Sequence, residues 1–462
     1  MRALAMVFCL SLAVFASAAS DESAAQAASA RFDGGGSSAD AAPTAVAPPP
    51  APAARPVSKA DAALRDDVER RAFRYFWEQA DPVTGQVPDR ASADGGAPRQ
   101  EKTEGASSVA ATGFGLAALC VGADRGWVSR GEAAARASKT LRFLLDKAPQ
   151  EHGFFYHFID ERTGARLWNS EASTIDTALL LAGALTAAQC FPGDPEVKRL
   201  SEAIYDRVDF PWMMKGKPPM LSMGWTPEKG FIPARWDTYS EHMILDLLAI
   251  GSPTHPIPAS EWYSWARPEV RYGTYTFVAG VNPLFIHQYS QAFVDFRGLK
   301  DRSGIDYFQN SVQATLAQRQ FFIDLSKTET TYGANVWGGT ASDTQNGYKA
   351  WGGPPAGGVD DGTVAPCAPG GSIMFTPEQS LDALREMKKR WGSKIYGRYG
   401  FVDAFNPATG WVDSDVLGID QGITLLSAED QRDGGVWRRF MANPEIGRAM
   451  SEVGFHQEAA TK

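Results

Sequence analysis

Carboxylates set among aromatic and amide side chains are the residues of this sequence best suited to chemistry. They are Glu171, Asp176, Glu241, Asp403 and Asp420. Cleavage of a glycosidic bond uses two carboxyl groups, one that donates a proton and one that acts as base or nucleophile. Tryptophan and tyrosine rings stack on the C–H faces of sugars, while amides bind sugar hydroxyls. The pattern therefore favours a carbohydrate cleft.

Glu241 and Asp176 stand at the starts of predicted helices. Acidic residues there can simply cap free N–H groups and interact with the helix dipole, which is the structural alternative for both. Glu241, however, is flanked by Trp236 and Tyr239, so it should be desolvated. Desolvation raises the pKa of a carboxyl and keeps a proton available. We therefore expect Glu241 to be the proton donor.

Asp420 stands among apolar residues and flanking glycines in the segment 417–422. Glycines allow a ligand to approach the backbone closely, although they also serve ordinary turns. We expect Asp420 to draw a proton from the attacking water. Asp403, Asp176 and Glu171 are expected to orient groups around it.

The residues expected to bind the substrate are aromatic or polar. They are Trp225, Trp236, Tyr239, His287, Tyr289, Asn335, Trp337, Trp351 and Gln421. For each tryptophan, a place in the core is the ordinary alternative. His287 and Tyr289 could also serve as base and acid of a polysaccharide lyase; binding of sugar hydroxyls is the interpretation favoured here.

Several other classes of chemistry lack their sequence signatures. We find no phosphate-binding loop, no His-Glu-x-x-His zinc motif and no Gly-x-Ser-x-Gly nucleophile motif. The 6 histidines are scattered, so no metal and no cofactor is expected. A formal net charge of −9 without basic runs lacks the footprint of a nucleic-acid-binding protein.

The N-terminal residues resemble a targeting signal. An arginine, the apolar run Ala3–Phe15 and the small residues Ala16-Ser17-Ala18 predict a secretory signal peptide over 1–18, and the run is short for a membrane anchor. Residues 19–57 are rich in Ala, Ser, Gly and Pro and predict a disordered linker. A catalytic domain over 58–456, periplasmic or secreted and free of the membrane after cleavage, is expected.

The elements that must position the carboxylates are predicted to be helices, because apolar residues recur at helical spacing. The predicted ranges are Asp61–Gln79, Ser107–Val121, Arg130–Leu145, Ile175–Phe191, Pro195–Val208, Glu241–Ile250, Ala259–Ala266, Gln288–Phe296, Ile305–Leu325, Pro377–Trp391, Gly418–Ser427, Val436–Ala442 and Pro444–Val453. Few strand patterns separate them, which favours an all-α fold such as a single helical toroid. The long loops Met214–Thr238 and Tyr332–Phe375 should carry function at one rim.

Six segments together carry a resemblance to a known family. They are Tyr75–Glu78, Ser170–Leu180, the stretch from Tyr239-Ser240-Glu241 to Pro256, Tyr332–Gly338, Tyr399–Phe405 and Gly418–Gly422. In this order they resemble the glycoamylase-like family of bacterial secreted proteins, which includes β-1,2-glucan hydrolases (glycoside hydrolase family 144).

The resemblance implies an (α/α)6 toroid with long loops that form a cleft at one rim, and inverting hydrolysis without a metal. It also implies that Glu241 is the general acid, Asp420 the base and Asp176 a further acidic group of the cleft. Endo-acting relatives of this kind carry Asp-x-x-Glu where this chain has Ser173 and Asp176. The Ser-x-x-Asp pattern of this chain is more similar to that of family members with exo-acting or unassigned specificity.

We therefore expect a secreted or periplasmic inverting glycoside hydrolase that acts on a β-glucan or an oligosaccharide, with β-1,2-glucan favoured. The substrate is the only partner expected. A polysaccharide lyase on a helical toroid and a glycan-binding protein without activity are the two alternatives.

Overall fold

The computed structural model describes residues 57–98, 103–216, 218–354 and 361–457. The signal peptide expected over 1–18 lies outside them, as does the linker expected over 19–57 except for its last residue. Within the described part of the chain, no helix combines the length and the apolar character needed to span a bilayer.

Helices form most of the regular structure. The α-helices are α3 (Lys59–Gln79), α4 (Val109–Asp124), α5 (Arg130–Asp146), α6 (Thr174–Cys190), α7 (Pro195–Asp206), α8 (Phe210–Met213), α9 (Met243–Ile250), α10 (Phe285–Gln288), α11 (Tyr307–Leu325), α12 (Cys367–Gly371), α13 (Pro377–Trp391), α14 (Gly418–Arg432), α15 (Gly435–Met441) and α16 (Pro444–Val453). Three 3-10 helices are described, η2 (Ala259–Tyr263), η3 (Ser290–Ala292) and η4 (Gly392–Lys394). The mostly helical class predicted from the sequence is confirmed.

The strands are short and pair antiparallel in small sheets. They are β1 (Arg90–Ser92), β2 (Ala106–Ser108), β3 (Gln150–Glu151), β4 (Phe154–Phe155), β5 (Phe158–Asp160), β6 (Ala172–Ser173), β7 (Gly224–Thr226), β8 (Gly230–Phe231), β9 (Glu269–Tyr272), β10 (Tyr275–Val278), β11 (Leu299–Lys300), β12 (Ala341–Ser342), β13 (Lys349–Ala350), β14 (Tyr396–Gly397), β15 (Gly400–Phe401), β16 (Phe405–Asn406), β17 (Trp411–Val412), β18 (Asp415–Leu417) and β19 (His456–Gln457). β6, β7 and β8 form one three-stranded sheet. The long loop 214–238 thus folds back on the start of α6.

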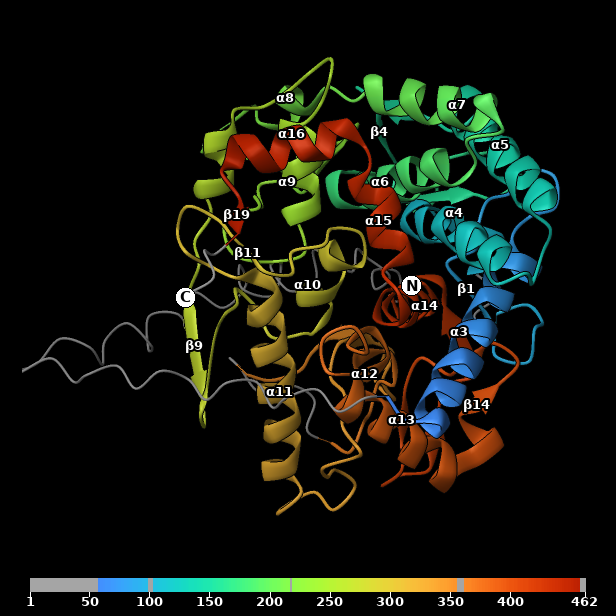
Figure 1. Cartoon of the computed structure of the whole chain (residues 1–462). Coiled ribbons are helices and arrows are strands. Elements are labelled where there is room, and N and C mark those ends of the chain that lie inside the picture. Colours follow the sequence, from blue (N-terminus) through green and yellow to red (C-terminus); the bar gives the residue numbers. More distant parts are fainter. Residues whose placement is uncertain (1–56, 99–102, 217, 355–360, 458–462) are drawn as a thin grey trace, which may run out of the picture.

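One set of helices packs each against the next. α4 packs against α6, α6 against α9, α9 against η3, η3 against α10, α10 against α12, α12 against α14, and α14 against α4. Other helices cover this set: α3 packs on α4 and α14, α7 on α5 and α6, α16 on α9, and α13 on α12. Figure 1 shows α3, α5, α7 and α13 at the periphery and α14 near the middle.

The contact between α4 and α6 depends on two glycines. A Cβ added at Gly183 of α6 would overlap the carbonyl oxygen of Gly113 in α4, and a Cβ at Gly113 would overlap the backbone of Leu179. The helix axes can therefore approach closely only because both positions lack a side chain. This close contact fixes the relative position of the two helices whose N-terminal ends lie near the candidate site.

Three helices of the set begin immediately after a short strand. β2 precedes α4, β6 precedes α6 and β18 precedes α14, and these strands pair with β5, β7 and β1. Ser108 and Ser173 cap α4 and α6 by accepting hydrogen bonds from the backbone of the first turn. Strand pairing therefore holds the N-terminal end of each helix in place.

Two predicted helices differ from the structure in more than their bounds. The predicted helix Gln288–Phe296 is wrong: α10 ends at Gln288, and only the 3-10 turn Ser290–Ala292 follows. Ser290 Oγ donates to the Glu241 carbonyl and Gln291 Nε2 to the Tyr307 carbonyl, so these polar side chains serve tertiary contacts. The predicted helix Ala259–Ala266 is the shorter 3-10 helix η2.

Candidate active site

Glu241 lies two residues before α9, and its side chain is buried. The Ser240 hydroxyl donates a hydrogen bond to the Glu241 carboxylate. Burial raises the pKa of the Glu241 carboxyl to about 7; the negative charge of Asp176 adds to this rise and the Ser240 hydrogen bond opposes it. A carboxyl with such a pKa keeps a proton near neutral pH and can donate it.

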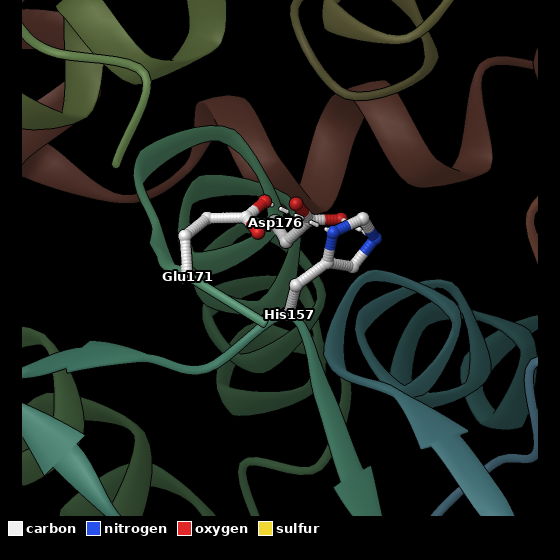
Figure 2. Close-up of side chains that lie close together, drawn as sticks. All are labelled: His157, Glu171 and Asp176. Carbon is white, nitrogen blue, oxygen red and sulfur yellow. Dashed lines mark hydrogen bonds and ion pairs between the residues drawn. The ribbon is translucent and has the colours of Figure 1, made fainter. Parts of the chain in front are cut away.

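His157 lies against two of the predicted carboxylates, and the sequence analysis did not select it. Its Nδ1 is 3.1 Å from Glu171 Oε1, and its Nε2 is 3.4 Å from Asp176 Oδ1. Figure 2 shows the three side chains pointing toward one another. Burial alone would lower the pKa of His157, but the charges of Asp176 and Glu171, with a contribution from Asp89, raise it to about 9. His157 is therefore a buried cation near neutral pH.

Asp176 occupies the first turn of α6 and is held from two sides. Ser173 Oγ donates a hydrogen bond of 2.5 Å to Asp176 Oδ2 and accepts one of 3.2 Å from the Asp176 backbone N–H. Burial raises the pKa of Asp176, while the positive charge of His157 opposes that rise. Because Asp176 also raises the pKa of Glu241, its charge influences the predicted proton donor.

Asp420 occupies the first turn of α14, beside Asp403 and Cys367. Burial raises the pKa of Asp420 to about 6, against opposing hydrogen bonds from Asp403 and Cys367. Burial and the neighbouring charge of Asp420 raise the pKa of Asp403 well above its ordinary value. Of this pair, Asp403 therefore keeps its proton to higher pH, and Asp420 is the member that ionises first. A small cavity, about the size of one water molecule, is lined by Asp420 and Gln421.

Further acidic residues surround this pair, and the sequence analysis did not select them. The Asp343 backbone N–H donates to Asp403 Oδ2 at 2.6 Å, and the Asp343 carboxylate is 2.8 Å from Arg90 Nη1. Burial and the charge of Asp343 raise the pKa of Asp413 to about 7. Arg90 also pairs with Asp89, and it brings a positive charge to a region dominated by carboxylates.

Tyr289 links the two groups of carboxylates. Burial raises the pKa of its hydroxyl well above the ordinary value, and the charges of Asp420, Glu241 and Asp176 raise it further. Because Coulomb energies decline with distance, a hydroxyl that responds to all three carboxylates lies near each of them. The predicted acid and the predicted base are therefore near one residue, although 179 positions separate Glu241 from Asp420 in the sequence (420 − 241).

The aromatic residues predicted to bind substrate differ in exposure. Trp225 on β7 is half-buried and lies against Trp212. Trp236 and Trp351 are buried, and their ring N–H groups donate to Thr174 Oγ1 and Ser342 Oγ. Of these three, Trp225 has the most surface to offer a sugar.

Two further predicted residues are fully enclosed. Trp337 and Tyr239 are each 0% exposed, so neither ring has a face open to a sugar in this structure. The Tyr239 hydroxyl lies 3.0 Å from His287 Nδ1, and burial lowers the pKa of His287 to about 3, which makes it a neutral core residue. The rings of Trp265 and Tyr307 pack against Tyr239, and the ring of Phe277 packs against His287. Asn335, in contrast, is half-buried in a turn.

Three groups of side chains have the donor types of a metal site within the described ranges, with ligand atoms inside 4.8 Å of one another. They are His157, Glu171 and Asp176; Cys367, Asp403 and Asp420; and Asp343, Asp403 and Asp413. In the first group the charges of Asp176 and Glu171 raise the pKa of His157 to about 9, so a metal would have to displace a proton from the imidazole. In the third group Asp343 already pairs with Arg90.

The sequence matches known proteins over most of its length. A family model described as "Putative glucoamylase" matches residues 233–444. The chain is 29% identical over 433 residues to the exo β-1,2-glucooligosaccharide sophorohydrolase (non-reducing end) of Parabacteroides distasonis, over 85% of this chain and 58% of that protein. The chain thus spans little more than half the length of this relative.

Two solved structures resemble the chain along almost their whole length. A "putative glucoamylase" from Bacteroides caccae is 32% identical, with a TM-score of 0.78, over 86% of this chain and 100% of that one. An endo-β-1,2-glucanase from Chitinophaga pinensis, in complex with sophorotriose and glucose, is 30% identical, with a TM-score of 0.79, over 86% and 99%.

The fold and the site define a mostly helical protein whose buried carboxylates gather at helix starts. With these matches, the chain belongs to the glycoamylase-like family, as its sequence segments predicted.

Proposed function

We propose that this protein is a glycoside hydrolase that cleaves β-1,2-linked glucan or its oligosaccharides with inversion of configuration. Glu241 protonates the glycosidic oxygen, directly or through a substrate hydroxyl, and Asp420 takes a proton from the attacking water. The proposal draws its substrate from the sophorohydrolase and the endo-β-1,2-glucanase to which the chain is similar. The finer fold that we propose is an (α/α)6 toroid, supported by the series of contacts that runs from α4 through α14 and back to α4.

One observation carries the proposal: two buried carboxyl groups near Tyr289 have pKa values suited to opposite roles. Burial raises the pKa of Glu241 to about 7, which leaves a large protonated fraction at neutral pH. The pKa of Asp420, at about 6, leaves it mostly ionised there. Two carboxyl groups in different protonation states are what acid–base cleavage of a glycosidic bond requires.

Asp403, Asp176 and Glu171 have supporting roles in this proposal. Asp403 retains its proton and hydrogen-bonds Asp420, so one carboxylate charge is left for the base. The His157 cation pairs with Glu171 and Asp176, which keeps two carboxylates in fixed positions beside the acid. Ionised carboxylates accept hydrogen bonds from sugar hydroxyls and can orient the ring.

Product analysis tests the function. The protein is incubated with linear β-1,2-, β-1,3- and β-1,4-glucans and with an α-glucan, products are separated by chromatography, and their anomeric form is followed by polarimetry. We expect sophorose or larger β-1,2-oligosaccharides released as the α-anomer. Release only from another glucan would refute the substrate, and release of the β-anomer would refute inversion.

Substitution of the two carboxylates tests the mechanism. Glu241→Gln and Asp420→Asn should each lower kcat by about 10²-fold or more while the protein stays folded. Asp237→Asn is the matched control, because Asp237 is exposed and lies four positions before Glu241. Near-normal turnover by either site variant would remove that residue from the mechanism.

The same experiment separates the two alternatives. A polysaccharide lyase would release unsaturated products that absorb in the ultraviolet and would depend on His287 and Tyr289. A glycan-binding protein would show no turnover, and both carboxylate substitutions would change only affinity. We further propose a periplasmic or secreted location, supported by the signal peptide predicted over 1–18.

A further inference from the structure

The hairpin formed by β12 and β13 lies beside the predicted base, in the long loop that the sequence analysis expected to carry function. Its two strands pair Ala341 with Ala350 and Ser342 with Lys349. The Trp351 ring N–H donates to Ser342 Oγ at 2.9 Å, which ties the hairpin to a buried ring. Its tip, 345–347, is exposed.

Asp343 fastens this hairpin to the carboxylate cluster. Its backbone N–H donates to Asp403 Oδ2 at 2.6 Å, and its carboxylate pairs with Arg90 at 2.8 Å. One residue of the hairpin thus contacts both the acidic partner of the predicted base and the nearby cation. The hairpin therefore has a fixed position relative to Asp403 and Asp420.

Tyr348 is on the same hairpin, and its hydroxyl is directed into the protein. The residue as a whole is half-buried, but its hydroxyl oxygen is buried and has no hydrogen-bond partner among the described residues. Burial raises the pKa of this hydroxyl well above the ordinary value, and the charges of Asp420, Asp403 and Asp343, together with Tyr289, raise it further. The hydroxyl is therefore a neutral donor in a region rich in acceptors.

Nearby carboxylate oxygens are complementary to this donor. Asp420 Oδ2 and Asp403 Oδ1 are also buried, and the proton of Asp403 supplies only one hydrogen bond within this pair. A buried polar group left unpaired costs about 1–3 kcal/mol, so the Tyr348 hydroxyl and the lone pairs left on these oxygens point to a ligand that pairs with them. A hydroxyl group fits, since it can accept from Tyr348 and donate to a carboxylate at the same time.

We propose that Tyr348 is a further catalytic residue, whose hydroxyl binds an O–H group of the reacting complex, either the attacking water or a sugar hydroxyl, between itself and Asp420. This inference rests on the proposed hydrolysis. Tyr348 fixes the position of the O–H group, and Asp420 accepts its proton or hydrogen bond. Only hydrogen bonds form through Tyr348, and the phenol keeps its own proton throughout.

Tyr348→Phe tests this role, because it removes the oxygen and keeps the ring. Since the hydroxyl has no protein partner, the melting temperature should stay within about 2 °C of wild type. The value of kcat/KM should fall at least tenfold. Tyr272→Phe is the matched control. Tyr272 is also half-buried on a hairpin, but its hydroxyl donates to Asp324, and none of the cluster carboxylates contributes to its pKa, so this variant should keep wild-type activity.

The kinetic constants distinguish the two sources of the O–H group. A fall in kcat at unchanged KM assigns the attacking water, and a rise in KM at unchanged kcat assigns a sugar hydroxyl. Unchanged constants overturn the inference, and so does a loss of activity that accompanies a drop of several degrees in melting temperature. If wild type hydrolyses no glucan, the proposed function fails, and calorimetric titration with sophorose then tests the role of Tyr348 separately. A tenfold weaker affinity of Tyr348→Phe would support a contact between Tyr348 and the sugar. Equal affinity, or no binding by wild type, would overturn the inference.

Discussion

The pH dependence of hydrolysis follows from the pKa values of Glu241 and Asp420. The proposed mechanism requires Glu241 to be protonated and Asp420 to be ionised. With an ordinary pKa of 4.5, about 0.3% of Glu241 would be protonated at pH 7, whereas a pKa of about 7 gives about 50%. Burial thus increases the protonated fraction of Glu241 about 150-fold at this pH.

The two pKa values together predict a narrow, bell-shaped dependence of kcat/KM on pH. Activity rises as the pH rises through about 6, where Asp420 ionises, and falls as the pH rises through about 7, where Glu241 loses its proton. The correctly protonated fraction is about 60% at pH 6.5 and about 9% at pH 5 and at pH 8, a sixfold change on each side. The acidic limb reports the Asp420–Asp403 pair, because the two carboxyl groups titrate together.

The assay is kcat/KM for release of reducing sugar, measured every half pH unit from 4.5 to 9 at constant ionic strength. Asp176→Asn provides the internal test, because removing its negative charge should move the alkaline midpoint to lower pH. A profile that stays flat from pH 5 to 8 would refute the roles of both carboxyl groups. An alkaline midpoint that Asp176→Asn leaves in place would refute the coupling between Asp176 and Glu241.

Three further predictions concern stability and binding. The pKa of His157 is raised to about 9, so the stability that its positive charge contributes is complete below about pH 6.5 and is lost as the pH rises to 9. The free energy of unfolding of wild type, measured with urea, should fall by up to about 3 kcal/mol over this range. His157→Gln should not show this fall. Gly183→Ala should lower the free energy of unfolding by about 1–3 kcal/mol, because the new Cβ would overlap α4. Gly131→Ala is the control and should not lower it, because a Cβ there meets open space. Equal effects of the two substitutions would argue against close packing of α4 on α6. Trp225→Ala should raise KM several-fold, because it removes about 1 kcal/mol of stacking free energy with a sugar ring. An unchanged KM would remove this ring from the binding surface.

Most of the helices could be predicted from the sequence, since helical periodicity is a local property. The predicted ranges Pro377–Trp391 and Pro444–Val453 agree with α13 and α16 at both ends, where a proline at the first position marks the start. The helix predicted over Gln288–Phe296 was wrong, because Ser290 and Gln291 bond the backbone of distant segments, and periodicity does not record such contacts.

The site was predictable where a polar residue stood out against its immediate neighbours. Asp420 was found in this way, as the charged residue in an apolar first turn. His157, Asp343 and Tyr348 were missed, because each lies in a bend or hairpin of mixed composition and owes its environment to residues distant in the sequence.

The sequence by itself determined most of the helices, the family and the list of candidate carboxylates, because composition, periodicity and local motifs are properties of the amino-acid order alone. Only the tertiary structure decided which carboxyl groups hold protons and which aromatic rings stay accessible. Trp337 and Trp225 are alike as residues, yet the first is enclosed and the second half-exposed. Burial and charge proximity depend on three-dimensional distance, and the chain brings together residues that its order keeps far apart.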